Sequence, residues 1–258
     1  MTGTNDGNLI RLEKSDLNLP IYRIYSLERF EIMLSSNRDA LVNPTMWEDP
    51  FENFFLERTE VKESNLSPPI PLKNLAQDWY GQCWSLNEDT DAMWRIYSPN
   101  AKKVGVKVST TIQRLFDNLK RVGSSAPYLQ FFVGKILYQT EKEITSLMEN
   151  ITFTDVAIGG QGYKFANLLC LKRDAFEHEK EIRIIFQDMA HSGEKQGLNG
   201  IFRYPLDPNT IFDKVVLDPR LELPEVNKIQ QKLNTAGCTL PIQQSLLYQT
   251  PKFTIPYQ

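Results

Sequence analysis

Short β-prone stretches and amphipathic helical stretches follow one another irregularly along the chain, and this feature limits the possible folds more than any other. Residues 21–27 and 104–109 have the residue types of strands, whereas 28–36 and 110–123 carry apolar residues at helical spacing. The regular strand–helix–strand repeat that builds a parallel sheet is missing from the pattern. We therefore expect an α+β protein with a mixed or split β-sheet and flanking helices.

Further elements are expected along the whole length of the chain. Strands are predicted at 80–86, 129–140, 176–186, 201–206 and 213–219, and helices at 87–98, 163–175 and 224–237. Neither an internal repeat nor a long linker divides the 258 residues. We therefore expect a single domain over 1–258, in which 1–18 form a flexible N-terminal segment.

The composition argues against several classes of protein. A net charge of −3 does not favour a strongly basic nucleic-acid-binding surface. No apolar run approaches the roughly 18–20 residues that span a bilayer, and the N-terminus lacks the pattern of a signal peptide. Three widely spaced cysteines and two histidines favour neither a disulfide framework nor a zinc site. We expect a cytoplasmic protein that requires no metal and no membrane.

The stretch 176–186, FEHEKEIRIIF, has a glutamate at every second position (Glu177, Glu179 and Glu181). Side chains at i and i+2 of an extended strand point the same way, so the three glutamates would share one face with Arg183. Carboxylates in one small site raise each other's pKa and can act as general base or cation stabiliser. Taken alone, the stretch favours a simpler interpretation, a solvated strand end whose arginine pairs with a glutamate.

Two neighbouring segments supply candidate polar and aromatic groups. Trp84 and Ser85 end a predicted buried strand, where a serine can bind a neighbouring glutamate, although most such serines are turn residues. Trp94 and Tyr97 lie at helical spacing in the next element, and core packing is the simpler interpretation of both. Since no histidine is placed to suggest a Ser–His–Asp arrangement, a nucleophilic serine is not expected.

Arg23 lies between tyrosines in the β-prone sequence IYRIYS. An arginine within an apolar strand needs partners, because an unpaired buried charge is costly. An internal acid is the simpler partner. A pyrophosphate is the alternative, because the planar guanidinium suits phosphate oxygens.

A metal-dependent hydrolase or nuclease would recruit Asp49 together with Glu179 and Glu181. Such sites commonly need a carboxylate two residues before a lysine, but the residue two before Lys180 is His178. Asp49 itself lies in the sequence WEDPF, which reads more simply as a turn whose aromatics fill the core. The metal-dependent class therefore remains an alternative and is not the leading hypothesis.

Several segments together resemble the bacterial DUF2971 family. The resemblance rests on IYRIYSLERFEIMLSSNRDALVNPTMWEDPFE, CWSLNEDTDAMWRIYSPNAKKVGVKV, FEHEKEIRIIF and DKVVLDPRLELPEVNKIQQKL, in that order, over roughly residues 21–235. The chain departs from the family pattern at Glu48, Arg95, Phe176 and Asp218. The family name carries no function, so the resemblance bears on the fold.

A second pattern resembles the Arg–Ser–Glu class of ADP-ribosyltransferases: Arg23 on an early strand, Ser85 at a strand end, and Glu179-Lys180-Glu181 on a later strand. This resemblance implies an ADP-ribosyltransferase-like split sheet and NAD as substrate. Arg23 would hold an NAD phosphate or the adjacent ribose, and Ser85 would brace Glu181. Glu181 would stabilise the oxocarbenium-like transition state, while Glu179 would position or deprotonate the acceptor.

The same resemblance implies that Trp84, Trp94 and Tyr97 belong to the cofactor-binding set, with Trp94 or Tyr97 stacking on the nicotinamide. The leading hypothesis is an enzyme that transfers ADP-ribose from NAD to an unknown protein or nucleic acid, or hydrolyses NAD, as toxins and phage-defence effectors do. The main rival is a non-catalytic ligand-binding or regulatory module whose glutamates pair with Arg23 and Arg183. Arg23 and Glu181 lining one open cleft would favour the enzyme, whereas a buried salt bridge between them would favour the module.

Overall fold

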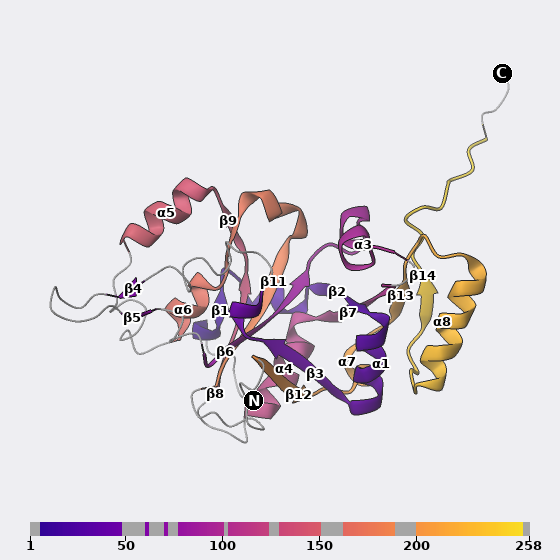
Figure 1. Ribbon diagram of the computed structural model, residues 1–258, viewed down its shortest axis with the longest axis horizontal. Helices are drawn as coiled ribbons and strands as arrows, with labels where there is room; N and C mark the ends of the chain where they lie inside the picture. Colours follow the sequence, from indigo (N-terminus) through magenta and orange to yellow (C-terminus); the bar gives the residue numbers. More distant parts are fainter. Residues whose placement is uncertain are drawn as a thin grey trace.

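A computed structural model describes residues 6–47, 60–61, 70–71, 77–100, 103–123, 129–150, 162–188 and 200–254. Within these residues a ten-stranded sheet crosses the molecule (Figure 1). Its strands, in spatial order, are β1 (Leu9–Ile10), β8 (Leu129–Lys135), β11 (Glu181–Asp188), β6 (Trp79–Ser85), β2 (Pro20–Ser26), β7 (Gly105–Thr111), β13 (Val215–Leu217) and β14 (Ile242–Gln244), while β3 (Arg38–Val42) joins β6 and β12 (Ile201–Pro205) joins β3.

The sheet is mixed and divides at β6. β1 pairs with β8 and β13 pairs with β14 in parallel, and the other neighbours are antiparallel. One part of β6 pairs with β3 at Gly81, whereas its last residue, Ser85, pairs with Tyr22 of β2. The expected α+β class, with a mixed sheet and flanking helices, is confirmed.

Helices and short strands cover both faces of the sheet. The helices are α1 (Leu27–Ser36), α3 (Asp91–Tyr97), α4 (Ile112–Gly123), α5 (Glu141–Asn150), α6 (Tyr163–Leu168), α7 (Pro208–Ile211) and α8 (Leu223–Thr235). The 3-10 turns are η1 (Asp6–Asn8), η2 (Lys14–Asn18), η3 (Pro44–Met46) and η6 (Asp174–Glu179), and the small sheets are β9 (Leu137–Gln139) with β10 (Leu171–Arg173) and β4 (Glu60–Val61) with β5 (Ile70–Pro71). No helix in the described ranges has the length and apolar character needed to cross a membrane.

Alternate residues of β11 enter different cores. Ile182 and Ile184 belong to the large core formed with α1, α4 and α8, whereas Ile185 belongs to a smaller core formed with α6. Glu181 and Arg183 point to the same side as Ile185, because side chains alternate along a strand. Both are buried, with 3% and 0% of their surface exposed. The interpretation of this stretch as a solvated strand end is therefore wrong, although the expected pairing of Arg183 with a glutamate is present.

Three other expectations differ from the structure. The helix expected at 163–175 ends at Leu168 and is followed by β10 and η6. The strand expected at 176–186 starts only at Glu181. The segment 1–18 was expected to be flexible, but its described part includes buried Leu9 and Leu17, and β1 pairs with β8. These apolar side chains bring residues 6–18 into contact with the core, and residues 1–5 lie outside the described residues.

The Trp47 ring packs closely against the backbone of Gly81 and covers Arg183, the buried arginine of β11. The guanidinium carbon of Arg183 lies 4.1 Å from the centre of the Trp47 ring. A Cβ added at Gly81 would lie 2.6 Å from Cζ2 of that ring, closer than atoms can pack. Glycine is therefore needed at this position for the indole to reach the arginine.

We expect Gly81→Ala to displace Trp47 and to lower the free energy of unfolding by about 1–3 kcal/mol, the usual cost of overpacking. Urea denaturation followed by tryptophan fluorescence measures the change. Gly7→Ala is the matched control, because nothing lies within 4 Å of a Cβ added there. Equal unfolding midpoints for the two variants would contradict the role given to Gly81.

Candidate functional site at the division of the sheet

A cavity of about 260 Å³ lies where β2, β6 and the turn before β11 come together. Its wall includes two arginines, two glutamates and several aromatic rings. The lining residues are Tyr22, Arg23, Ile24, Tyr25, Ser26, Arg29, Cys83, Trp84, Ser85, Met93, Tyr97, Glu179 and Glu181. Six of the seven residues proposed from the sequence are thus brought together, and Trp94 is the exception.

Trp94 belongs to the core and not to the cavity wall. Its side chain is fully buried against Ile24 and Val216, and its indole N–H donates to Asp89 Oδ1 at 2.6 Å. It borders an adjoining space of about 10 Å³. The expectation that Trp94 stacks on a nicotinamide is therefore not supported by its position.

Trp84 and Tyr97 do border the larger cavity. Trp84 is 2% exposed, and its indole N–H donates to Gln82 Oε1 at 2.8 Å, which fixes the ring. Tyr97 is 43% exposed at the end of α3 and forms the more accessible wall. Although part of this side chain is exposed, desolvation against the cavity wall and the neighbouring Glu179 raise the pKa of Tyr97, so its hydroxyl stays protonated and can donate a hydrogen bond.

The end of β6 holds the turn that carries the glutamates. Ser85 Oγ donates to the carbonyl of Glu179 at 2.6 Å, the Leu86 N–H donates to the carbonyl of Lys180 at 3.0 Å, and Asn87 Nδ2 donates to the carbonyl of His178 at 2.7 Å. Lys180 adopts a left-handed conformation with φ of 44°. The last residue of β6 and the two residues after it therefore bind three consecutive carbonyls, those of residues 178–180.

This turn corrects two expectations. Glu177 and Glu179 lie in η6 and not in the strand, so the three glutamates do not share a strand face. The hydroxyl of Ser85 binds the backbone of Glu179 and not the carboxylate of Glu181. Ser85 and Glu181 are nevertheless direct cross-strand partners, so their side chains point to the same side.

Two cations hold the carboxylate of Glu181. Arg183 Nε and Nη2 donate to Oε1 at 2.8 and 2.7 Å, and Lys172 Nζ lies 3.2 Å from Oε2. Burial raises the pKa of Glu181, but Arg183 and Lys172 outweigh it and leave the pKa below its ordinary value. Glu181 is therefore ionised at neutral pH.

Lys172 was not anticipated from the sequence. Its Nζ also lies 2.7 Å from Glu179 Oε2, so one ammonium connects the two carboxylates. We expected a helix over 163–175, and a helix there gives no reason to place Lys172 beside the strand that carries Glu181. A lysine directly after the apolar run LLCL was the available signal.

Arg23 contributes a positive charge to the cavity that Glu179 and Glu181 also line. Its Nη1 is buried and has no hydrogen-bond partner among the described residues, and its guanidinium carbon lies 4.8 Å from the centre of the Tyr25 ring. Burial lowers the pKa of Arg23, yet Tyr25 and Asp39 raise it, and the net shift is upward. Arg23 makes no ion pair with Glu181 in the described structure, so of the two arginines expected to pair with the glutamates in a closed module, Arg183 is the one that does.

The cavity has cationic and acidic ends. Arg23 and Arg29 line it together with Ser26, the N-cap of α1, whereas Glu179 and Glu181 line it from the other side of β6. The sequence pattern does not indicate Arg29, because the apolar residues at helical spacing account for the whole of this segment as a helix. An elongated ligand with an anionic part and an electron-poor part matches this distribution of charge.

No group of three or more histidines, cysteines or acids in the described ranges could hold a metal ion. Asp49 lies outside those ranges, so the metal-dependent alternative stays untested.

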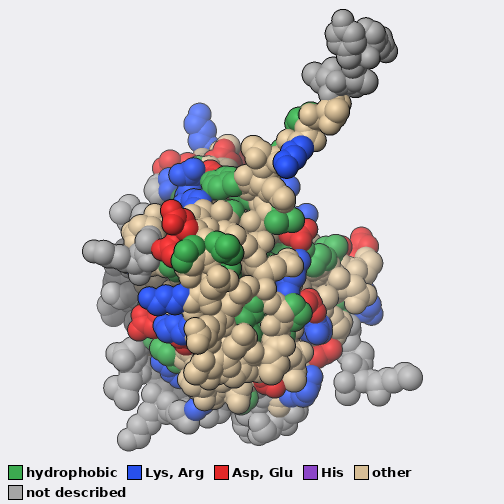
Figure 2. Space-filling model, turned by 90° about the vertical axis from the view of Figure 1, so that its right-hand side faces the viewer, with side chains coloured by type: hydrophobic (Ala, Val, Ile, Leu, Met, Phe, Trp, Pro, Cys, Tyr) green, Lys and Arg blue, Asp and Glu red, His purple; other side chains and the backbone are tan. Residues whose placement is uncertain are grey.

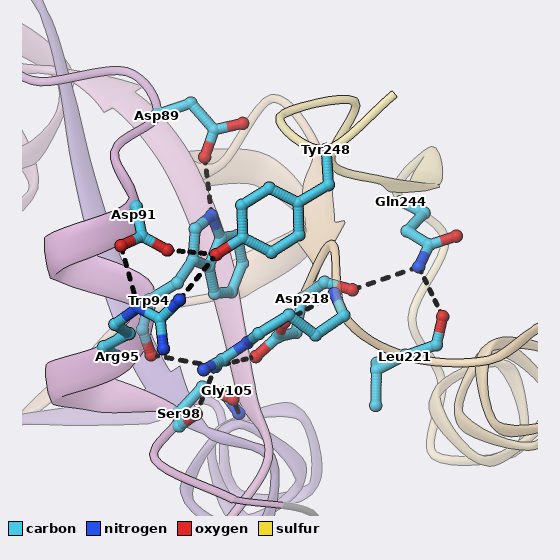
Figure 3. Close-up of polar contacts among 11 residues, drawn as sticks. Asp89, Asp91, Trp94, Arg95, Ser98, Gly105, Asp218, Leu221, Gln244 and Tyr248 are labelled. Carbon is cyan, nitrogen blue, oxygen red and sulfur yellow. Dashed lines mark hydrogen bonds and ion pairs between the residues drawn. The ribbon is translucent and has the colours of Figure 1, made fainter. Parts of the chain in front are cut away.

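Residues close to the C-terminus fasten helix α3, which carries Met93 and Tyr97 of the cavity wall (Figure 3). Tyr248 donates its hydroxyl hydrogen to Asp91 and accepts from Arg95 at 3.4 Å. Ser245 Oγ donates to Asp89 Oδ2 at 2.5 Å. Beyond this attachment, residues 249–254 leave the body as an extended tail (Figures 1 and 2).

Asp89 joins this attachment to the sheet. It accepts from Trp94 and Ser245, and Oδ1 lies 2.9 Å from Lys107 Nζ, a side chain on β7 that is almost wholly buried. Burial raises the pKa of Asp89, but the hydrogen bonds from Ser245 and Lys107 lower it further than burial raises it. One ionised carboxylate thus connects α3, β7 and the C-terminal segment.

We expect Asp89→Asn to lower the free energy of unfolding at neutral pH by about 1–3 kcal/mol, because Lys107 loses its ion pair. A carboxyl group whose pKa is depressed on folding stabilises above its unfolded pKa of about 3.9 and loses that contribution as pH falls through its folded pKa. The difference from wild type should therefore vanish in acid. Urea denaturation from neutral to acidic pH tests this dependence, with Asp117→Asn on α4 as control. A difference in the free energy of unfolding that does not change with pH would contradict the link to the ionisation of Asp89.

Cys83 reports on the cavity independently of any activity. Its side chain is half-buried in the cavity wall, whereas Cys170 and Cys238 are buried at 0% and 6% exposure. We expect iodoacetamide to modify Cys83 at least about tenfold faster than the other two, since a thiolate must be accessible to react. Mass spectrometry of timed samples measures this, and a ligand that fills the cavity should protect Cys83 alone. Equal modification rates of all three cysteines would contradict the selective accessibility of Cys83.

Comparisons with known proteins gave structural neighbours only. No family model matches the chain, so the resemblance to DUF2971 stays a prediction, and no curated protein matches it. DarT from Thermus sp. 2.9 in complex with ADP-ribosylated ssDNA has a TM-score of 0.36 and 11% identity, covering 88% of this chain and 94% of DarT. The complex of the same protein with NAD+ has a TM-score of 0.36 and 8% identity, covering 88% and 96%. These values are too low for the role of any DarT residue to be carried over to this chain.

Proposed function

We propose that the cavity binds NAD and that the protein cleaves the nicotinamide–ribose bond, transferring ADP-ribose to a macromolecular acceptor. The supporting observation is that three segments distant in sequence, which carry Arg23, Ser85 and the pair Glu179 and Glu181, border one cavity. The volume of about 260 Å³ lies just below the range of about 300–1,000 Å³ that is usual for ligand pockets. We therefore expect only part of NAD to be enclosed, with the remainder extending outside.

The cationic end suits the diphosphate of NAD. Arg23 carries a buried Nη1 without a hydrogen-bond partner among the described residues, and phosphate oxygens accept from guanidinium groups in a fixed planar geometry. Arg29 borders the same space and adds a second positive charge. In this arrangement a phosphate oxygen that reached Arg23 Nη1 would supply the hydrogen-bond partner that this atom lacks among the described residues.

The acidic end suits the cleavage step. When the bond between ribose C1′ and the nicotinamide nitrogen breaks, the electron pair leaves with nicotinamide and positive charge develops on the ribose. An ionised carboxylate at Glu181 would stabilise that charge. The acceptor then attacks C1′, and Glu179 would take the proton that the acceptor loses. The products are nicotinamide, the ADP-ribosylated acceptor and a proton.

One observation favours a second candidate function. Both carboxylate oxygens of Glu181 already lie within ion-pair distance of a cation, Arg183 or Lys172. Such a carboxylate attracts a developing positive charge less strongly than an unpaired one. The rival is therefore a module that binds NAD or a related nucleotide in the same cavity without cleaving it.

The decisive experiment measures binding and turnover separately. Calorimetry gives the affinity for NAD, and chromatography gives nicotinamide release with and without protein or nucleic-acid acceptors. We expect Glu181→Gln to reduce turnover by about 10²–10³-fold, the usual effect of losing a group that stabilises transition-state charge, with little change in affinity. Arg23→Ala should instead weaken binding by about tenfold or more.

Exposed residues of the same types provide the controls. Glu177→Gln, in the solvent-exposed part of η6, and Arg203→Ala, on an exposed position of β12, should leave both measurements unchanged. Binding without turnover in any condition would favour the non-catalytic module. Wild-type protein that neither binds NAD nor releases nicotinamide would overturn the proposal.

A further inference from the structure

Lys172 occupies an unusual place between the two carboxylates of the cavity. Its Nζ lies 2.7 Å from Glu179 Oε2 and 3.2 Å from Glu181 Oε2, and the lysine side chain is only 8% exposed. The glutamate side chains are themselves 13% and 3% exposed. An ammonium held this closely between two largely buried carboxylates influences the charge and the position of both.

A small sheet outside the main one fixes the position of this lysine. Lys172 on β10 is the register partner of Tyr138 on β9. The Tyr138 hydroxyl accepts from the backbone N–H of Glu181 at 2.8 Å, and the Phe176 ring lies 4.9 Å from Lys172 Nζ. The small sheet is therefore attached to the first residue of β11, directly beside the ammonium.

Two neighbouring carboxylates cannot both stay ionised without compensation, because their repulsion raises the pKa of one of them. Arg183 reaches only Oε1 of Glu181, so it compensates one carboxylate directly. Lys172 reaches both. It also reduces the negative charge that the cavity would present to an anionic ligand.

We propose that Lys172 is a positioning residue for the transfer reaction, which keeps Glu179 and Glu181 ionised together and directed into the cavity. This inference rests on the proposed function of the site and adds a requirement to it. While Lys172 holds Glu179, that glutamate is a weak base. An acceptor that displaces the ammonium from Glu179 Oε2 would make its carboxylate available for the proton.

Apart from Arg183, which holds Glu181, the tyrosines and the cysteine described beside the pair add no positive charge. Tyr138 and Tyr97 have pKa values raised chiefly by burial, so they remain neutral. Cys83 also borders the cavity, but a thiol carries no positive charge. Removal of the Lys172 charge should therefore leave one carboxylate protonated nearer to neutral pH, and the acid limb of the turnover profile should move upward.

The test compares the pH dependence of kcat/KM for NAD in wild type, Lys172→Met and Lys172→Arg. We expect the acid limb to rise by about one pH unit or more in Lys172→Met and to stay close to wild type in Lys172→Arg. Lys228→Met, on an exposed position of α8, is the matched control. A folded Lys172→Met protein with the wild-type acid limb would overturn the inference.

A double variant guards against a simple failure to fold. Lys172→Met/Glu179→Gln removes the like charge together with its compensation, so the titration midpoint of Glu181 should return toward that of wild type. Isotope-labelled glutamate side chains, with the Glu181 signal assigned by Glu181→Gln, give these midpoints by NMR without NAD. If wild type fails to bind NAD, the proposed function fails, whereas unchanged glutamate midpoints in Lys172→Met would sink the role of Lys172 on its own.

Discussion

The buried guanidinium of Arg183 is the interaction around which this region of the fold is organised. With 0% of its surface exposed, it cannot be solvated by water and must find its partners within the protein. It finds the carboxylate of Glu181, the carbonyl of Leu169 and the face of Trp47. These partners come from the strand itself, the end of α6 and the residue after η3. The contacts of Arg183 thereby connect β11 to the segments around Leu169 and Trp47.

That constraint also gives the candidate site its form. Because Arg183 and Lys172 hold Glu181 ionised, a carboxylate can lie at the end of a buried strand without taking up a proton. The division of the sheet at β6 then opens space beside it, since β2 pairs with β6 at only one residue, Ser85. The positive side chains of β2 and α1 border that space from the opposite side. The cavity thus exists because β2 and β6 pair at only one position and are separated beyond it.

Much of this arrangement could be predicted from local patterns, and the remainder could not. Alternation and helical spacing predicted β2, β6 and α1, because their apolar faces are regular. The turn before β11 was mistaken for strand, because alternating glutamates imitate strand periodicity while the chain follows a 3-10 turn held by Ser85. The partner of Glu181 was also missed, since Lys172 reaches it through the tertiary pairing of β9 with β10. Local periodicity carries no information about a pairing of that kind.

The two candidate functions differ in how one set of ion pairs is used. Removing a single partner of a buried pair leaves an uncompensated charge, so the contacts of Glu181 with Arg183 and Lys172 contribute to stability whatever the cavity binds. The same contacts reduce the attraction of Glu181 for a developing positive charge. An enzyme must therefore loosen one contact during the reaction, and the Lys172 contact, at 3.2 Å, is longer than either Arg183 contact, at 2.8 and 2.7 Å. Lys172 also has a second carboxylate, Glu179, to which it can remain bound during cleavage, before an acceptor displaces it from that residue. The geometry therefore allows Glu181 to gain negative character through a small movement of one lysine, while the arginine that organises the fold stays in place.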